Sequence, residues 1–153
     1  MKVHYYNPIP DTRELSDKLW TKYSELVGVE INEERMTRLL ELCSTKFKDE
    51  YESLPRFKTP HPHQYYIFNG SFEAVDGEVC YCIIRYFKPK RVFEVSSGNS
   101  TKLMAQALLK NKKEGYEGKL IVIDPSPDKI VMKGLPGLYK VIQAKVQDIP
   151  RTV

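Results

Sequence analysis

Apolar residues recur at helical spacing in two segments of the N-terminal part of the chain. The first segment covers residues 11–28 and begins at a candidate capping box formed by Asp11 and Glu14. The second covers residues 32–51. The apolar positions are Leu15, Leu19, Tyr23 and Leu26 in the first segment, and Met36, Leu39, Leu40, Cys43, Phe47 and Tyr51 in the second. Both patterns predict amphipathic helices, and the second stripe is expected to pack against the remainder of the protein.

From about residue 71 onward, helical and strand patterns alternate. A helix is predicted from Ser71 or Asp76 to Phe87, followed by a buried strand at 91–95 and a helix through Leu103. A second buried strand is predicted at residues 120–123, and a third, alternating strand at 139–146. Gly134, Pro136 and Gly137 restrict the segment between these two strands to a short helix. Neighbouring parallel strands need crossovers of this kind, so the pattern predicts an α/β fold with about three parallel strands.

Two acidic residues mark the ends of the first two predicted strands. Glu94 lies where the first apolar run ends, and Asp124 follows the second run directly. The carboxyl ends of parallel strands meet at one rim of a sheet, where ligands bind in open α/β folds. Each acid alone also fits a solvated strand end or, before Pro125, a turn. Together they predict a nucleoside-type binding site at this rim.

Composition fits one soluble globular protein. The chain has 153 residues, of which 41% are hydrophobic and 29% charged, and its net charge is +4. This modest basic excess alone gives no argument for a nucleic-acid or membrane partner. The sequence has no apolar run of membrane-spanning length and no signal-peptide core at its N-terminus. Three cysteines without framework spacing predict reduced thiols, and hence a cytoplasmic protein.

A proline-rich stretch at residues 54–64 separates the helical part from the rest of the chain. It contains His61 and His63, a pair that could ligate a metal. Two ligands without a third or fourth nearby make a weak site, so no metal is predicted. The aromatic run after this stretch, Tyr65-Tyr66-Ile67-Phe68, is expected to contribute to packing.

The segment Val92-Phe-Glu-Val-Ser-Ser-Gly-Asn-Ser-Thr, followed by a helix and by Ile121-Val-Ile-Asp-Pro, resembles the first two motifs of class I S-adenosylmethionine-dependent methyltransferases. Their usual pattern is acid-x-Gly-x-Gly after the first strand and an acid after the second. The resemblance extends from about residue 69 to residue 150. It implies a Rossmann-like three-layer αβα sheet with S-adenosylmethionine as cofactor and an unidentified molecule as methyl acceptor.

The resemblance assigns a role to each matching residue. Ser96, Ser97 and Gly98 correspond to the turn that approaches the methionine part of the cofactor, and Glu94 faces its amino end. Asp124 corresponds to the acid that binds both ribose hydroxyls, and Asp148 to an acid that contacts the adenine amino group. A carboxylate suits a diol or an amine because it offers about four lone-pair sites. No catalytic residue is identified.

Ser96 departs from the pattern because it stands where the family has its first glycine. The added side chain is expected to narrow the pocket or to change the backbone angle. Two other interpretations remain open. One is a non-catalytic binding or interaction module, and the other is a nucleotide or dinucleotide binder, although the turn lacks the further glycines of a dinucleotide fingerprint.

The resemblance accounts for three strands, whereas methyltransferases of this class have about seven. We therefore expect residues 1–68 to form a helical N-terminal cap and residues 69–153 a partial Rossmann-like cofactor-binding domain, as in a fragment or truncated product. A three-stranded parallel sheet leaves an edge and an apolar margin uncovered, which predicts self-association or low stability.

Overall fold

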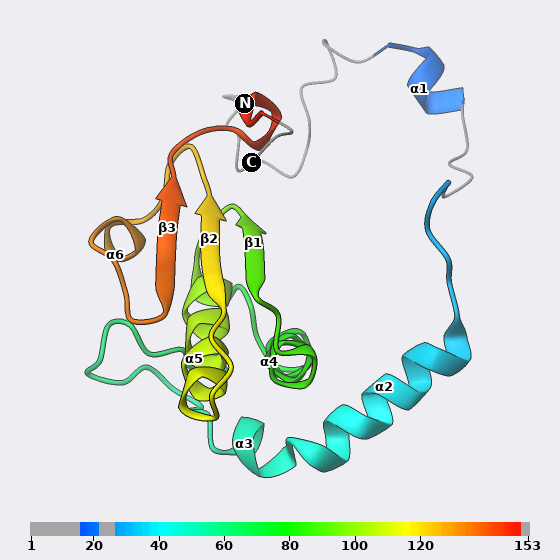
Figure 1. Cartoon of the computed structure of the whole chain (residues 1–153). Helices are drawn as coiled ribbons and strands as arrows, with labels where there is room; N and C mark the ends of the chain where they lie inside the picture. Colours follow the sequence, from blue (N-terminus) through cyan, green and yellow to red (C-terminus); the bar gives the residue numbers. More distant parts are fainter. Residues whose placement is uncertain (1–15, 22–26, 151–153) are drawn as a thin grey trace. The chain divides into compact units, whose positions relative to one another are not determined.

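The computed structural model describes residues 16–21 and 27–150 of the chain (Figure 1). The protein has two compact units, residues 1–33 and 34–153. In the first unit the described residues include one short helix, α1 (Lys18–Thr21). The predicted capping box and most apolar positions of the first helix, namely Asp11, Glu14, Leu15, Tyr23 and Leu26, lie outside the described residues.

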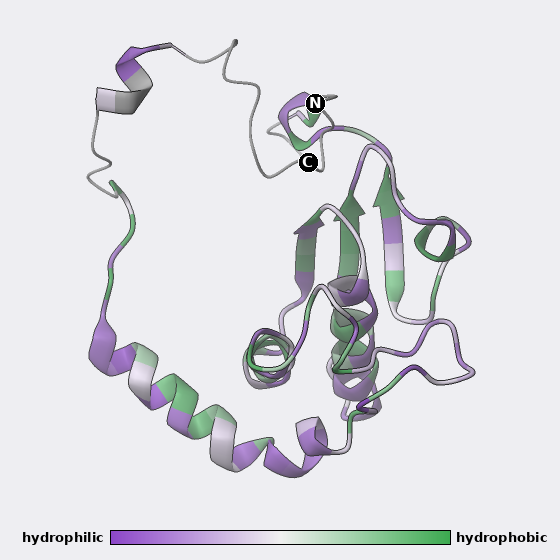
Figure 2. Ribbon diagram, turned by 180° about the vertical axis from the view of Figure 1, so that it is seen from behind, coloured by the Kyte–Doolittle hydropathy of each residue, from purple (hydrophilic) through white to green (hydrophobic). Residues whose placement is uncertain are grey.

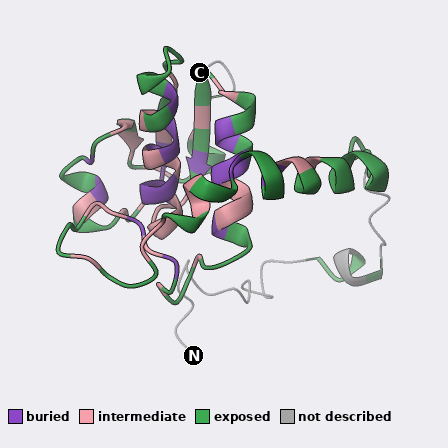
Figure 3. Cartoon of the chain, turned by 90° about the horizontal axis from the view of Figure 1, so that it is seen from below, coloured by how far each residue is buried: buried purple, intermediate pink, exposed green. Residues whose placement is uncertain are grey.

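The second predicted helix is present but divided. Helix α2 (Glu33–Lys46) ends one residue before Phe47, and α3 (Lys48–Glu52) follows it. Phe47 has φ −114° and ψ 12°, outside helical values, and its ring is buried together with Cys43. Met36 and Leu40, further toward the N-terminus, are exposed, and Figure 3 shows that most of α2 is exposed. Of the predicted apolar stripe, Leu39, Cys43, Phe47 and Tyr51 therefore pack in the buried cluster that includes Cys82 of the rest of the unit, whereas Met36 and Leu40 do not.

Three parallel strands form one sheet in the order β1-β2-β3. They are β1 (Arg91–Val95), β2 (Lys119–Ile123) and β3 (Leu138–Ile142). The pairing register of β1 and β2 is regular, whereas the register of β2 and β3 shifts between Leu120 and Ile121. The third strand was predicted to reach Val146, but it ends at Ile142 and the 3₁₀ turn η2 (Val146–Asp148) follows.

Helices alternate with the strands as predicted. Helix α4 (Asp76–Phe87) precedes β1, α5 (Asn99–Lys113) connects β1 to β2, and the short α6 (Lys129–Met132) lies between β2 and β3. Their inward residues form one core with the inward residues of β2, and Tyr65 and Ile67 from the aromatic run join it, as predicted. Each fully buried Leu or Val contributes roughly 1.5–3 kcal/mol. Figure 2 shows the apolar residues concentrated in the strands and on one side of the helices.

The core lies on one face of the sheet. Leu120 and Val122 of β2 point into it, and Val131 of α6 shares it with Leu103 and Leu108 of α5. On the other face Phe93 and Val95 are 47% and 60% exposed. The α/β class and the parallel strands after N-terminal helices are confirmed. A three-layer arrangement has a helical layer on each face of the sheet, and the described residues supply one of the two. The predicted domain boundary between residues 68 and 69 remains a prediction.

In the described part of the chain, no helix combines the length and apolar character needed to cross a membrane.

Candidate functional site

The turn that follows β1 begins at Ser96. This residue has φ 74°, a left-handed backbone angle that glycine adopts far more readily than other residues. Its N–H donates to the carbonyl oxygen of Ile123 at 2.9 Å and so extends the contact between β1 and β2. The backbone therefore keeps a glycine-type angle at the position where the sequence has serine. Serine was expected either to narrow the pocket or to change the backbone angle at this position. The backbone angle is not changed.

Open space lies beside Gly98, two residues further along. A methyl group added to its Cα would have no atom within 4 Å, leaving out its chain neighbours. The N–H of Gly98 donates to the hydroxyl of Thr101 at 2.9 Å, which fixes the start of α5. Ser97 and Gly98 are both half-buried. The turn thus has room for a ligand next to its backbone.

Asp124 lies at the end of β2 and is fully buried. Its Oδ2 accepts a hydrogen bond from Ser97 Oγ at 2.5 Å, and its Oδ1 accepts one from the N–H of Ser126 at 2.8 Å. Its own N–H donates to the carbonyl oxygen of Ile142 at 3.0 Å. The structure thus brings Asp124 and the predicted turn together. A ligand hydroxyl that binds Oδ2 would replace the Ser97 hydroxyl, which can rotate away.

Glu94 points toward the start of α5 and is 7% exposed. Its Oε1 accepts from Ser100 Oγ at 2.5 Å, while its buried Oε2 has no hydrogen-bond partner among the described residues. Burial raises the pKa of Glu94; the hydroxyls of Ser100 and Thr101 oppose this rise, and the charge of Asp124 adds to it. The two predicted acids therefore interact electrostatically across the rim.

A pair of asparagines that the sequence analysis did not single out connects a second loop to this rim. Asn99, the first residue of α5, donates through Nδ2 to Asn69 Oδ1 at 3.0 Å and to Ser71 Oγ at 3.1 Å. Asn69 in turn donates to the carbonyl oxygen of Phe72 at 2.6 Å. The loop before α4 is thereby held beside the turn after β1. No local pattern in the sequence indicates that Asn69 and Asn99, 30 positions apart, are partners.

Asp148, the remaining predicted residue, lies on η2 and is exposed. Within the described part of the chain, no hydrogen bond or ion pair joins it to Asp124 or to the turn after β1. The structure therefore gathers five of the six predicted residues at the rim: Glu94, Ser96, Ser97, Gly98 and Asp124. A role for Asp148 remains a prediction.

His61 and His63 do not belong to this rim. They line a hollow of about 280 Å³ together with Gln106 and Pro136. Among residues 16–21 and 27–150, no three His, Cys, Asp or Glu side chains are grouped so that they could hold a metal ion.

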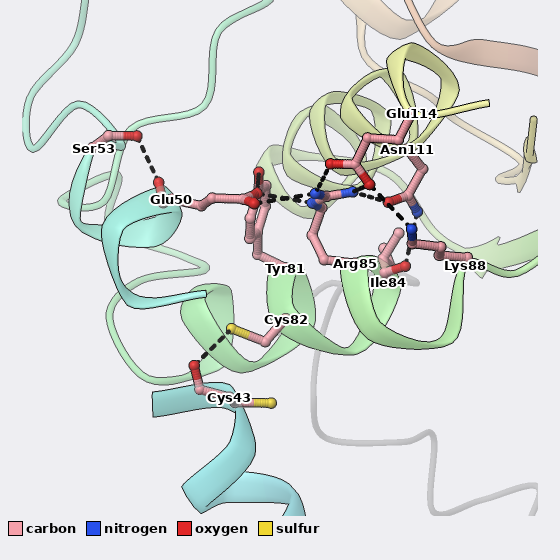
Figure 4. Close-up of polar contacts among 10 residues, drawn as sticks. All are labelled: Cys43, Glu50, Ser53, Tyr81, Cys82, Ile84, Arg85, Lys88, Asn111 and Glu114. Carbon is pink, nitrogen blue, oxygen red and sulfur yellow. Dashed lines mark hydrogen bonds and ion pairs between the residues drawn. The ribbon is translucent and has the colours of Figure 1, made fainter. Parts of the chain in front are cut away.

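A second polar cluster joins three helices away from the rim (Figure 4). Arg85 of α4 is buried and donates to Glu50 of α3 through Nε at 2.8 Å, to Glu114 and to Asn111 of α5. Tyr81 donates to the same Glu50 at 2.8 Å. Every group of this cluster that Figure 4 shows has a protein partner, so the cluster holds α3 and α5 against α4.

Comparison with known proteins adds little to this picture. No protein-family model matches the chain, and no solved structure matches it. The chain is 28% identical, over 160 residues, to an uncharacterized protein of Archaeoglobus fulgidus; the match covers 95% of this chain and 68% of that protein. The similarity extends over almost the whole sequence, but that protein's name states no activity.

Proposed function

We propose that this chain is the cofactor-binding portion of a class I S-adenosylmethionine-dependent methyltransferase. The observation that carries the proposal is the glycine-type angle of Ser96, in a turn whose next residue donates a hydrogen bond to Asp124. A tight turn and a carboxylate at the ends of adjacent parallel strands lie where open α/β sheets bind nucleotide ligands.

The residues present fit this cofactor. Asp124 offers two carboxylate oxygens for a ribose diol. A ribose hydroxyl would replace the hydroxyl of Ser97 as the hydrogen-bond donor to Oδ2. The open space beside Gly98 suits the methionine part, and the unpartnered Oε2 of Glu94 is an acceptor for its ammonium group. Asp148 is assigned to the adenine amino group by the resemblance alone.

When bound, S-adenosylmethionine supplies a sulfonium methyl group that an acceptor nucleophile attacks in line. The contribution of this chain is to hold and orient the cofactor, because positioning is a major source of rate in such reactions. The methyl acceptor is not identified by any residue described above.

Calorimetric titration with S-adenosylmethionine and S-adenosylhomocysteine tests the proposal. We expect both to bind, and Asp124→Asn to weaken binding more than tenfold, because asparagine replaces one of the two acceptor oxygens by an NH2 group, which cannot accept from a ribose hydroxyl. Asp128→Asn is the matched control. Asp128 caps α6 through the N–H groups of Ile130 and Val131, and asparagine caps a helix equally well.

Circular dichroism establishes that each variant is folded. A folded wild-type chain that binds neither nucleoside would exclude the proposal. Preferential binding of a nicotinamide dinucleotide in a parallel titration would favour a dinucleotide site at the same rim instead.

A non-catalytic interaction module is the second candidate, and one observation favours it. Phe93 and Val95 leave an apolar strip on the sheet face opposite the core, as a surface that binds another protein would. Cofactor binding without methyl transfer to any acceptor, together with concentration-dependent self-association, would support this alternative.

A further inference from the structure

The modest net charge of the chain conceals an uneven distribution. Residues 85–153 contain 14 Lys and Arg against 6 Asp and Glu, a net +8, whereas residues 1–84 contain 10 against 14, a net −4. A charge asymmetry between two parts of one chain indicates an electrostatic partner for the charged part. The fold determines where the positive charges gather.

Many of them lie at the amino ends of the strands, opposite the rim. Helices α4 and α5 each end where a strand is about to begin, so their C-termini meet this side of the sheet. The contacts are direct: the N–H of Lys119 donates to the carbonyl oxygen of Lys90 at 3.0 Å, and Arg91 is the register partner of Lys119. We call this surface the basic edge and define it by seven residues: Lys88, Lys90, Arg91, Lys112, Lys113 and Lys119, which lie at helix ends or strand starts, and Lys140 in the middle of β3.

Two carboxylates compensate part of this charge. Glu114 pairs with Lys88 at 3.1 Å as well as with Arg85, and Glu117 pairs with Lys112 at 2.7 Å. In the described part of the chain, no carboxylate forms an ion pair with the other five basic residues of the edge, all of which are exposed. The helix C-termini at this side carry only a fraction of a negative charge each. The basic edge therefore carries more positive than negative charges.

Two exposed aromatic rings lie among these cations. Tyr116 is 52% exposed with the Nζ of Lys88 at 3.7 Å from its ring centre, and Tyr139 is 58% exposed with the Nζ of Lys119 at 4.3 Å. Exposed rings beside cations are the arrangement on which unpaired bases stack while lysines and arginines neutralise the phosphates.

We propose that the basic edge binds single-stranded nucleic acid. Stacking on Tyr116 and Tyr139 requires unpaired bases, which favours a single strand over a duplex. An anionic membrane fits less well, because the edge consists of strand starts and helix ends and presents no amphipathic helix to insert. The proposal does not depend on cofactor binding at the opposite rim.

Fluorescence anisotropy with a labelled oligouridylate tests the proposal on the full chain. Arg91→Gln/Lys119→Gln removes two cations of the edge, and Lys129→Gln/Lys145→Gln removes two exposed cations elsewhere and is the matched control for net charge. We expect the first pair to weaken binding about tenfold and to lower the slope of log affinity against log salt by about 1.4, as loss of two phosphate contacts requires. The control pair should change affinity less than twofold.

Tyr139→Leu tests the stacking step separately. It should weaken binding about fivefold at unchanged salt slope, because a ring that stacks on a base contributes no charge. Equal losses in the two charge pairs would show that only net charge matters and would overturn the proposal. Binding of phosphatidylserine vesicles or polyglutamate as tight as that of the oligouridylate would overturn it as well.

Discussion

Ser97 Oγ donates a hydrogen bond to Asp124 Oδ2 at 2.5 Å and joins the turn after β1 to the end of β2. The two residues are distant in sequence and belong to different strand ends of one sheet. This hydrogen bond connects the two sequence motifs, because it links the turn after β1 to the carboxylate that follows β2.

Ser97→Ala should lower the free energy of unfolding by about 2 kcal/mol. A hydrogen bond to a charged group contributes about 1.5–3 kcal/mol, and Asp124 is fully buried, so water cannot replace the lost hydroxyl easily. Urea denaturation provides the measurement. The exposed Ser44, whose hydroxyl donates to the carbonyl oxygen of Glu41, is the control, and Ser44→Ala should change stability by less than about 0.5 kcal/mol. Equal effects of the two substitutions would contradict this role of Ser97.

Ser96→Gly should stabilise the protein by about 0.5–1 kcal/mol. Serine pays a steric cost at φ 74° that glycine does not, and the greater freedom of glycine in the unfolded chain offsets only part of the gain. The thermal midpoint should rise accordingly. Ser44→Gly, inside α2, should do the opposite, because glycine weakens a regular helix. A destabilised Ser96→Gly protein would mean that the serine side chain makes a contact that outweighs its strain.

Glu94→Gln should gain stability relative to wild type as the pH rises. Burial raises the pKa of Glu94 in the folded state, so the stability that its protonated form provides is fully present below the ordinary pKa of a glutamate. That stability is lost as the pH rises through the folded pKa. The glutamine variant, which does not ionise, escapes this loss.

Urea denaturation between about pH 4 and pH 8 measures the difference. Glu117→Gln provides the control: the hydrogen bond from Lys112 lowers the pKa of Glu117, so its contribution is lost only as the pH falls below the ordinary pKa of a glutamate, and its difference from wild type should stay constant as the pH rises above about 5. A difference between Glu94→Gln and wild type that does not change with pH would show that Glu94 ionises normally.

Arg85→Ala should destabilise the protein by about 3 kcal/mol. Removing one member of a buried ion pair commonly costs 3–5 kcal/mol, and the lower value applies because Glu50 keeps partial contact with water after the change. Arg38→Ala is the control: its pair with Glu34 is 73% exposed on both sides, and its loss should cost less than about 0.5 kcal/mol. Similar losses for the two arginines would show that the cluster around Arg85 contributes no more than a surface pair.

The elements that depend on local pattern were predictable from the sequence. Helix α4, the strands β1 and β2 and the positions of Glu94 and Asp124 at strand ends follow from apolar runs of strand length and from the turn after β1. Burial was predicted correctly for β2 but not for β1, whose Phe93 and Val95 are exposed. These features are encoded within a few residues of where they occur. The parallel direction of the strands followed from the same pattern, because a helix-length crossover between two strands is the connection that parallel strands need.

Features that depend on distant contacts were not predictable. The third strand ends at Ile142 because its partner β2 ends at Ile123, although alternation continues beyond that point. The division of the second helix at Phe47 likewise follows from the burial of that ring with Cys82 of α4. The bond between Asn69 and Asn99 and the cluster around Arg85 join segments about 26–35 residues apart, which no local pattern reports.

The parallel arrangement of the sheet also determines how the protein can fold. Arg91 and its register partner Lys119 are separated by the whole of α5, so no hairpin is available to start the sheet. The entropy of closing that loop must be lost before the first β1 to β2 contact forms. Formation of α5 shortens the loop, and so the speed with which this protein reaches its native state depends on a helix more than on any strand.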